Sequence, residues 1–149
     1  MGTHFKGSDK EENSLNAYIK LVRATESINS RQSKSLAKEN LTMSQFGALE
    51  VLYHLGELNQ REIGKKLLKS GGNITLVIDN LVKRELVKKK TDKSDRRAVI
   101  VSLTKKGQEF IEGYFPKHLA LIMEQFSVLT DEERTELARI CKKLGLNNV

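Results

Sequence analysis

The residues with the clearest capacity for chemistry are basic, and they are concentrated in one part of the chain. Residues 60–106 contain fourteen Lys or Arg and five Asp or Glu, a net charge of +9, whereas the rest of the 149 residues sums to −2. A segment of this charge is typical of a surface that contacts a polyanion such as a nucleic acid. A solvated lysine-rich face is an equally common origin of such a run, so charge alone leaves both interpretations open.

Within this basic segment, small and polar residues precede apolar residues at helical spacing, which predicts a helix that begins near residue 70. Five residues at its start are candidates for contacting DNA: Ser70, Gly72, Asn73, Thr75 and Leu76. Small residues let the helix end approach DNA closely, and the helix dipole there favours phosphate. Asn73 can hydrogen-bond a base edge, Thr75 can use its hydroxyl or its methyl group, and Leu76 can contact a thymine methyl. Ser70 and Asn73 also fit a capping role, and for Ser70 we expect both roles.

A second group of polar residues separates two short segments that we expect to form strands. Residues 87–91 and 98–103 predict a hairpin, because Val99, Val101 and Leu103 in the second segment alternate with smaller or outward residues. The charged connection suits a projecting hairpin tip, which can reach along a DNA backbone. Its candidate contact residues are Lys93, Asp95, Arg96 and Arg97.

The elements that must position these two groups are mainly helical, since the chain has one proline and no tryptophan. Besides the helix near residue 70, apolar spacing and capping residues predict five helices, which begin near Asp9, Thr42, Asn59, Thr104 and Thr130. Pro116 falls inside one of them, so we expect a kink or a break there. The expected fold class is mainly α with a small β-hairpin wing, a winged helix-turn-helix flanked by terminal helices.

The hairpin and the residues that follow it resemble the wing signature of the MarR family of bacterial transcription regulators. Residues 95–107 read Asp-Arg-Arg-Ala-Val-Ile-Val-Ser-Leu-Thr-Lys-Lys-Gly, and the family's pattern of Asp-x-Arg followed by Val-x-Leu-Thr-x-x-Gly is matched at every position. Residues 41–42 with 45–46, and segments 60–67, 70–87, 115–118 and 129–145, also resemble that family. The resemblance therefore spans nearly the whole chain.

The resemblance implies a single MarR-type domain over residues 1–149, with a winged helix-turn-helix over 42–104 and dimerisation helices over 9–39 and 105–146. It implies a homodimer whose recognition helices lie about one DNA turn (~34 Å) apart on a pseudo-palindromic operator. The apolar residues of the outer helices support this modestly, because they exceed what a slim lobe of one chain could bury.

The resemblance also assigns roles to individual residues. It places Arg97 of the wing tip in the minor groove, with Asp95 bracing its guanidinium. Such an ion pair would hold the arginine side chain in one orientation before DNA binds. A narrow minor groove attracts the positive charge of the guanidinium. Arg96 fits a plain phosphate contact. Position 85 carries Glu85 where family members commonly have glycine, so we expect the end of the recognition helix to close differently.

Family members commonly release DNA when a small, often phenolic or aromatic, molecule binds between the dimerisation and DNA-binding lobes. Four residues can line such an effector cleft between the first two helices, namely Tyr18, Arg23, Tyr53 and His54, although packing explains the two tyrosines about as well. His4, His54 and His118 show no metal-ligand spacing, so we expect neither a metal nor a cofactor. Cys141 lies on the apolar face of the last helix, where we expect a buried, inert thiol.

These features favour a sequence-specific DNA-binding transcription regulator that acts as a homodimer and responds to a small effector. A repressor is favoured over an activator. The alternative is an architectural DNA- or RNA-binding protein that uses the same basic surface without sequence preference. An enzyme is not expected, because no nucleophile–base pair or carboxylate pair is recognisable and residues 70–72 lack the Lys-Ser/Thr of a P-loop. With no secretory signal, no apolar run of membrane-spanning length and a lone cysteine, we expect a cytoplasmic protein.

Overall fold

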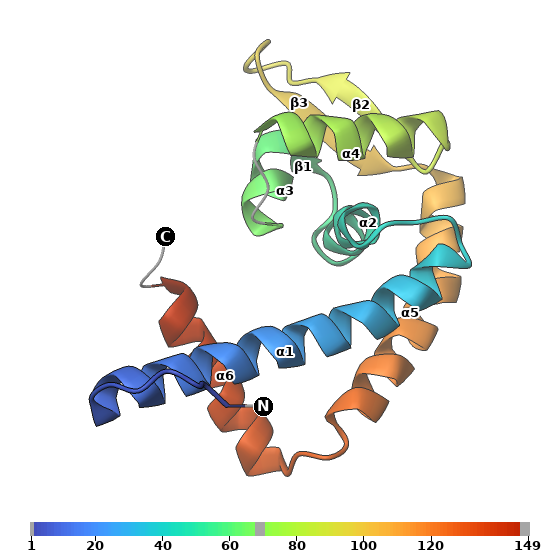
Figure 1. Cartoon of the computed structure of the whole chain (residues 1–149). Helices are drawn as coiled ribbons and strands as arrows, with labels where there is room; N and C mark the ends of the chain where they lie inside the picture. The colour runs from blue at the N-terminus through green and yellow to red at the C-terminus, as the bar shows by residue number, and fades with distance from the viewer. Residues whose placement is uncertain (1, 68–70, 147–149) are drawn as a thin grey trace. The chain divides into compact units, whose positions relative to one another are not determined.

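The computed structural model describes residues 2–67 and 71–146, which form six helices and three strands (Figure 1). The helices are α1 (Asp9–Ala37), α2 (Met43–Leu55), α3 (Gln60–Lys66), α4 (Gly71–Lys83), α5 (Lys105–Phe126) and α6 (Asp131–Leu146). The strands are β1 (Leu58–Asn59), β2 (Val87–Thr91) and β3 (Val99–Leu103). The expected fold class is confirmed. The chain divides into two compact units, the first ending at Gly113 and the second beginning at Tyr114.

The first unit contains a three-stranded antiparallel sheet in the order β1-β3-β2. Strands β2 and β3 form the expected hairpin, with Val87 opposite Leu103 and Thr91 opposite Val99. The strand β1 was not predicted, because two residues are too few to show a strand period. It pairs with the other edge of β3 and so fixes the start of α3 beside the hairpin.

Apolar side chains hold the helix-turn-helix and the sheet together. The almost fully buried ones come from α2, α3, α4 and the hairpin: Phe46, Leu49, Leu52, Ile63, Ile74, Ile78, Leu81, Leu86, Val87 and Val101. Each such side chain contributes about 1.5–3 kcal/mol relative to an exposed position. The spacing of Ile74, Ile78 and Leu81 places them on one face of α4, so the opposite face of that helix is turned to solvent.

Helices begin where capping residues predicted them. At the start of α2, Thr42 Oγ1 accepts from the Gln45 N–H at 3.1 Å, and Gln45 Oε1 accepts from the Thr42 N–H at 3.1 Å. Thr130 and Glu133 form the same reciprocal pair at the start of α6. The break considered at Pro116 does not occur, since α5 continues through it. A proline removes one helical hydrogen bond, and the turns on either side retain theirs.

The second unit has a turn between α5 and α6 that is held by Arg134. Its Nη1 donates to Phe126 O at 3.1 Å and to Leu129 O at 2.6 Å, and the guanidinium also pairs with Asp131. The last carbonyls of a helix have no partner within it and carry the negative end of its dipole. A cation at this position therefore satisfies the end of α5.

The end of α4 corrects one expectation. Glu85 takes a left-handed conformation, with φ 60°, as glycine would. The Leu86 N–H donates to Leu81 O at 3.0 Å and the Glu85 N–H to Val82 O at 2.9 Å, the pattern of a Schellman motif. The helix therefore closes as it would with glycine. Contacts with the start of α5 hold it there, because Thr104 donates from Oγ1 to Glu85 O at 2.6 Å and from its N–H to Leu86 O at 3.1 Å.

The same junction joins α4 to α1 and to the first turn of α5. Arg84 donates from Nη1 to Asn40 O at 2.7 Å and from Nη2 to Glu39 O at 3.1 Å, so its charge lies at the C-terminal end of α1. A cation is favourable there because of the helix dipole. Gly107 packs so closely that a Cβ built on it would lie 1.9 Å from Leu86 O. These contacts fix the orientation of α4 within the unit.

We expect Glu85→Gly to stabilise the protein by about 0.5–1 kcal/mol. A left-handed conformation costs a non-glycine residue about 1–2 kcal/mol. Glycine avoids this cost, but it loses more conformational entropy on folding, which offsets part of the gain. The exposed Glu85–Lys106 ion pair, at 3.9 Å, contributes little. Urea denaturation measures the change. Glu85→Ala is the control, because it removes the carboxylate and keeps the strain; an equal gain with alanine would contradict the explanation.

Gly107→Ala is expected to lower the free energy of unfolding by about 3 kcal/mol, because the added methyl group cannot be accommodated without moving the Leu86 backbone. Gly113→Ala is the matched control in the same helix. A Cβ at Gly113 meets nothing within 4 Å, and alanine's helix propensity should stabilise the protein by about 0.5–1 kcal/mol. Denaturation curves that show the same effect for both substitutions would refute the proposed close packing.

Candidate nucleic-acid interface

The first turns of α4 expose the residues that the sequence indicated as base-reading groups. Asn73 and Thr75 are exposed, and Leu76 is 64 % exposed although it is large and apolar. Gly72 is also exposed, and a Cβ built on it would meet nothing within 4 Å. Ser70 lies outside the described residues. Hydrogen-bonding and apolar groups thus occur together at the start of this helix, as direct reading of base edges requires.

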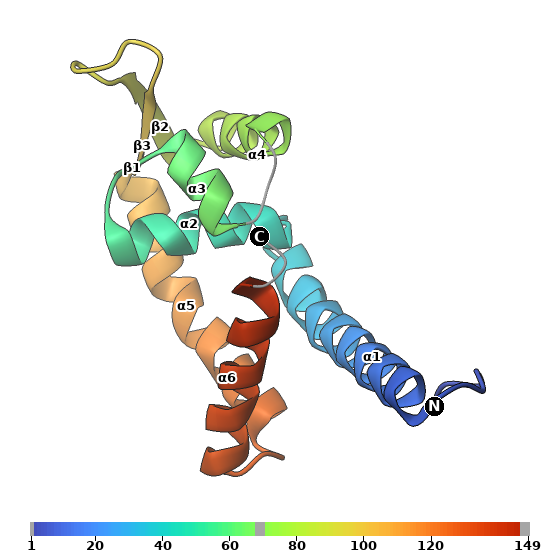
Figure 2. The same cartoon turned by 90° about the vertical axis from the view of Figure 1, so that its left-hand side faces the viewer.

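A cleft of about 740 Å³ lies beside this helix start. Residues from α3, α4 and the hairpin, together with the residue before α3, line it: Asn59, Gln60, Arg61, Gly64, Lys65, Ile74, Thr75, Asp95, Arg97, Ala98 and Val99. In Figures 1 and 2 the hairpin tip projects beyond the helices, and in Figure 1 it lies toward α3 and the start of α4. The lining contains three cations, Arg61, Lys65 and Arg97, against one acid, a balance that suits the phosphates of a nucleic acid.

Three lining residues add to the predicted contact set: Gln60, Arg61 and Lys65. In the sequence, only the positive charge of Arg61 and Lys65 indicated that they could contact a nucleic acid. Their proximity to the wing could not be predicted from the sequence, because it depends on the pairing of β1 with β3. Gln60 gave no signal at all. In the structure its Nε2 donates to Thr75 Oγ1 at 2.9 Å, which links α3 to α4.

Two carboxylates organise the hairpin tip. Asp92 Oδ1 accepts from the Ser94 N–H at 2.9 Å and from the Ser94 hydroxyl at 2.8 Å, and these bonds lower the pKa of Asp92. Asp95 Oδ1 accepts from the backbone N–H of Arg97 at 2.9 Å. The expected bracing of the Arg97 guanidinium by Asp95 is therefore wrong in its detail. The carboxylate holds the main chain of Arg97 in a turn, as Asp side chains commonly do, and the arginine side chain is exposed.

Two lysines of β2 connect the hairpin to neighbouring elements. Lys89 Nζ lies 2.7 Å from Asp79 Oδ1 of α4, and Lys90 Nζ lies 3.1 Å from Glu57 Oε2, just before β1. Both pairs are solvent-accessible, so each contributes at most about 1 kcal/mol. The tip of the hairpin carries exposed cations: Lys93, Arg96 and Arg97. Three exposed cations of the wing therefore lie at its end.

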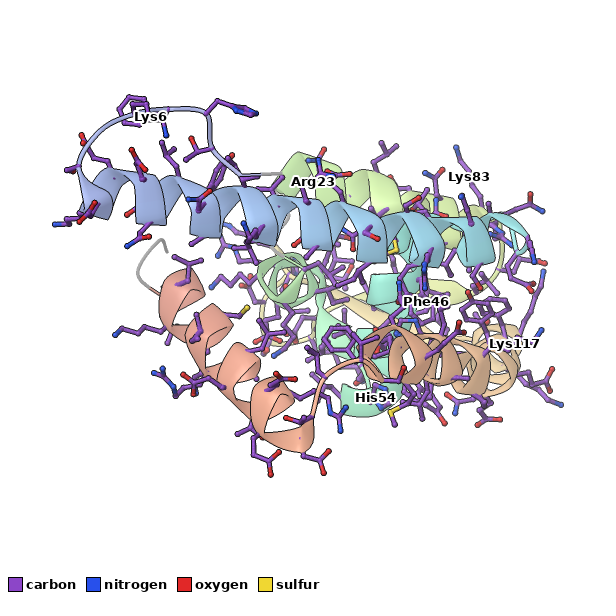
Figure 3. All side chains as sticks on the ribbon, turned by 60° about the horizontal axis from the view of Figure 1, so that its bottom comes forward. Lys6, Arg23, Phe46, His54, Lys83 and Lys117 are labelled. Carbon is purple, nitrogen blue, oxygen red and sulfur yellow. The ribbon has the colours of Figure 1, made fainter. Side chains whose placement is uncertain are left out.

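The four residues expected to line an effector cleft are not brought together within the described chain. Tyr53 and His54 are adjacent on α2, with ring centroids 5.0 Å apart. Tyr18 and Arg23 lie on α1, where Tyr18 is 64 % exposed. Figure 3 shows Arg23 and His54 well apart. One chain alone therefore does not form an effector site from these four residues.

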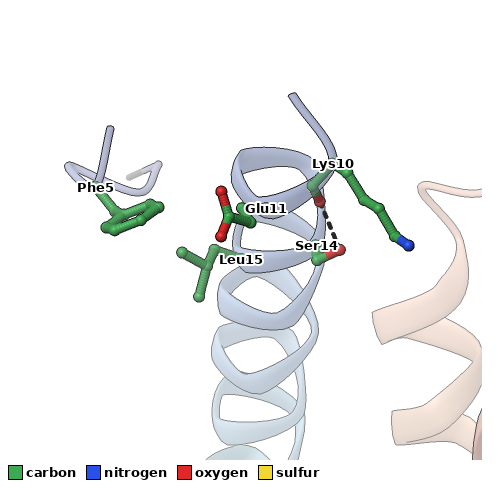
Figure 4. A pocket seen from close by; sticks show the side chains of 5 residues that line it. All are labelled: Phe5, Lys10, Glu11, Ser14 and Leu15. Carbon is green, nitrogen blue, oxygen red and sulfur yellow. Dashed lines mark hydrogen bonds between the residues drawn. The ribbon is translucent and has the colours of Figure 1, made fainter. Parts of the chain in front are cut away.

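A second cleft, of about 540 Å³, lies at the start of α1 (Figure 4). Its lining residues are Phe5, Lys10, Glu11, Ser14 and Leu15. The segment before α1 folds back along the helix, and the Thr3 N–H donates to Asn16 Oδ1 at 2.8 Å. Glu11 forms the capping box of α1 with Ser8, and the hydrogen bonds from Ser8 lower the pKa of Glu11. This cleft offers apolar surface and one cation, which gives no recognisable basis for chemistry.

The described residues give no support for metal binding, and the single thiol is exposed. Among the described residues, no group of three or more His, Cys, Asp or Glu is placed to hold a metal ion. In the same part of the chain, no helix is long and apolar enough to span a membrane. Cys141 is exposed, so the expectation of a buried thiol is wrong for the single chain. The apolar face of α6 on which it lies has no buried residue.

Comparison with protein families and curated proteins gives consistent matches. The sequence model of the MarR family matches residues 41–99. The chain is 40% identical to the HTH-type transcriptional regulator MhqR of Bacillus subtilis, over 91% of this chain and 94% of that protein. It is 30% identical to the HTH-type transcriptional repressor MdtR of the same organism, over 75% of this chain and 72% of that protein.

Solved structures show the same fold. The structure of AbsC, a MarR family transcriptional regulator from Streptomyces coelicolor, superposes with a TM-score of 0.85 at 21% identity, covering 96% of this chain and 97% of AbsC. BpsR of Bordetella bronchiseptica superposes with a TM-score of 0.78 at 25% identity, covering 87% of this chain and 98% of BpsR. The BpsR structure was determined to explain how 6-hydroxynicotinic acid regulates the DNA binding of that protein.

Proposed function

This chain belongs to the MarR family and is a DNA-binding regulator of transcription, and we propose that it is a homodimeric repressor whose pseudo-palindromic operator is released when a small effector binds. The relatives are transcriptional regulators and not enzymes. The observation that carries the proposal is the cleft in which α3, α4 and the hairpin tip bring three cations together with Thr75, one of the predicted base-reading residues.

The proposed contacts with DNA divide into base reading and phosphate binding. The start of α4 enters the major groove, where Asn73, Thr75 and Leu76 meet base edges. Arg97 reaches the minor groove from the wing tip, because a narrow minor groove attracts an exposed guanidinium. The remaining cations of this surface contact phosphates, which position the protein without reading sequence: Arg61, Lys65, Lys93 and Arg96.

Apolar surface on the outer helices supports the homodimer. Exposed large apolar side chains occur at helical spacing on three helices: Tyr18 and Val22 of α1, Leu119 and Met123 of α5, and Leu137, Ile140 and Leu144 of α6. Such stripes are what helices bury in an interface. We therefore assign dimerisation to residues 9–39 and 105–146 and DNA binding to 42–104. Two-fold symmetry would then place the two α4 helices about one DNA turn, ~34 Å, apart.

The proposal of an effector-released repressor is supported by relatives. MdtR is a repressor, and the DNA binding of BpsR is regulated by 6-hydroxynicotinic acid, a small aromatic acid. We infer that this chain responds to a phenolic or aromatic molecule of similar size. A site that used Tyr18, Arg23, Tyr53 and His54 would draw on both chains of the dimer, because these residues do not meet in one.

Combined substitution of Arg97, Asn73 and Thr75 by alanine should weaken binding to a genomic operator duplex by at least about 100-fold. Each specific contact contributes about 1–3 kcal/mol, and the variant removes three. Fluorescence anisotropy at a fixed salt concentration measures the loss. Lys38→Ala, which removes an exposed cation just beyond α1, is the control and should bind as the unmodified protein does.

The same assay also measures how affinity depends on salt concentration and how well other nucleic acids compete with the operator. Affinity of the unmodified protein should fall steeply with salt, because phosphate contacts release counterions. A random duplex should compete poorly with the operator. Two outcomes would overturn sequence-specific reading: undiminished binding by the triple variant, or equal competition by random DNA or RNA. Either would favour an architectural nucleic-acid-binding protein, which the charge of +9 by itself allows.

Met123→Glu combined with Ile140→Glu should convert the dimer to a monomer, because an interface cannot bury unpaired carboxylates at such positions without a large cost. Sedimentation velocity measures the mass. Lys142→Glu is the matched control: it changes charge on the other side of α6 and should leave the dimer intact. A monomeric unmodified protein, or a dimeric double variant, would refute the assignment of these helices.

A further inference from the structure

Two helices that are proposed to form the dimer are hydrogen-bonded to Arg84, the residue that follows α4. Its Nη1 donates to Asn40 O at 2.7 Å and its Nη2 to Glu39 O at 3.1 Å, both in the turn that follows α1. Its own carbonyl oxygen accepts from Lys106 Nζ, in the first turn of α5, at 3.1 Å. The end of the helix proposed to read DNA is thus joined to α1 and to the start of α5.

The link from Arg84 to α1 is directional. Leu36 of α1 is fully buried, but apolar burial tolerates rotation because the hydrophobic effect has no direction. A guanidinium is planar and presents its N–H groups in a fixed fork, so bonds to two consecutive carbonyl groups define an orientation. The turn that supplies these acceptors is held in place, because the Leu41 N–H donates back to Leu36 O at 3.1 Å. Arg84 is therefore suited to fix the angle between α1 and α4.

A small change in that angle would move the reading end of α4 by a large distance. The helix has 13 residues, and at about 1.5 Å per residue its first turn lies about 20 Å from Arg84. A pivot of roughly 10° at the junction would displace that turn by about 3.4 Å, the rise of one base-pair step. In a two-fold dimer the displacement occurs in both chains, so it changes the distance between the two reading ends. The half-site spacing that a dimer accepts depends on that distance.

We propose that Arg84 determines the half-site spacing of the operator, because it fixes the angle between α1, which is assigned to the dimer, and α4, which is assigned to the major groove. Arg84 is a positioning residue in this proposal and contacts no base. The inference rests on the proposed function, since it requires a homodimer on an inverted repeat. It assigns the choice among operators with identical half-sites to the end of α4 opposite its reading end.

The test uses operators that differ only in the distance between their half-sites. The unmodified full-length protein selects a duplex from a random pool, and one or two base pairs are then inserted at its centre or removed from it. A shift of one base pair should weaken binding of the unmodified protein by at least about 10-fold, because a misplaced half-site loses base contacts. Fluorescence anisotropy at a fixed salt concentration measures the affinities.

Variants at position 84 test the two hydrogen bonds. Arg84→Met keeps the aliphatic part of the side chain and removes both donors, so it should bind the shifted duplexes within about threefold of the selected one, less than the loss of one base contact. Arg84→Lys keeps the charge without the fork, and its spacing preference should also fall. An undiminished preference in Arg84→Met would overturn the proposal, and an undiminished preference in Arg84→Lys would overturn the role of the two bonds.

Arg61→Ala is the matched control, because it removes an arginine that is proposed to contact phosphate. It should weaken binding to every duplex by a similar factor and leave the spacing preference as it is. An Arg84 variant that had only lost stability would give the same uniform loss, and circular dichroism melting of each variant measures its stability. Uniform weakening by Arg84→Met with an unchanged preference would therefore assign Arg84 a purely structural role and overturn the proposal.

The unmodified protein separates failure of this inference from failure of the proposed function. A monomer, or a selected site without two half-sites, would refute the proposed function itself, and either result would be evident before any variant is compared. A dimer that selects two half-sites but binds every spacing equally would overturn the inference alone, because no spacing would then be fixed.

Discussion

The close approach of Gly107 to the carbonyl oxygen of Leu86 is the constraint on which the placement of the proposed DNA-binding surface depends. Because only a hydrogen atom fits there, Thr104 can reach the carbonyls of Glu85 and Leu86, and the end of α4 is held in its left-handed turn. Arg84 extends the same junction to the carbonyls of Glu39 and Asn40, just beyond the end of α1. A junction of backbone contacts is stiff, so the direction in which α4 points is set at its C-terminal end.

The opposite end of α4 is held differently. There a side-chain hydrogen bond runs from Gln60 Nε2 to Thr75 Oγ1, whereas the ion pair of Lys89 with Asp79 lies in the C-terminal half of the helix. Exposed pairs of this kind contribute little stability individually.

Much of this arrangement was predictable because its causes are local. The Thr42 and Thr130 capping boxes and the hairpin depend on residues a few positions apart, and each was found where expected. The conformation of Glu85 was not, because its partner Thr104 lies 19 residues further along the chain. Cys141 was misjudged for a related reason: an apolar helix face indicates burial, but what covers that face is decided outside the helix.

The sequence by itself determined the fold class, the location of α4 and of the hairpin, and the concentration of positive charge between Gln60 and Lys106. Periodicity, capping and charge act over short distances or add along the chain, so they can be read without coordinates. Only the tertiary structure decided which atoms are already committed. It directed the Asp95 carboxylate to a backbone N–H instead of a guanidinium, and it placed the Gln60 amide where it donates to Thr75 Oγ1, 15 residues away. Such pairings depend on which surfaces meet when the chain folds, and neither residue type nor spacing specifies that.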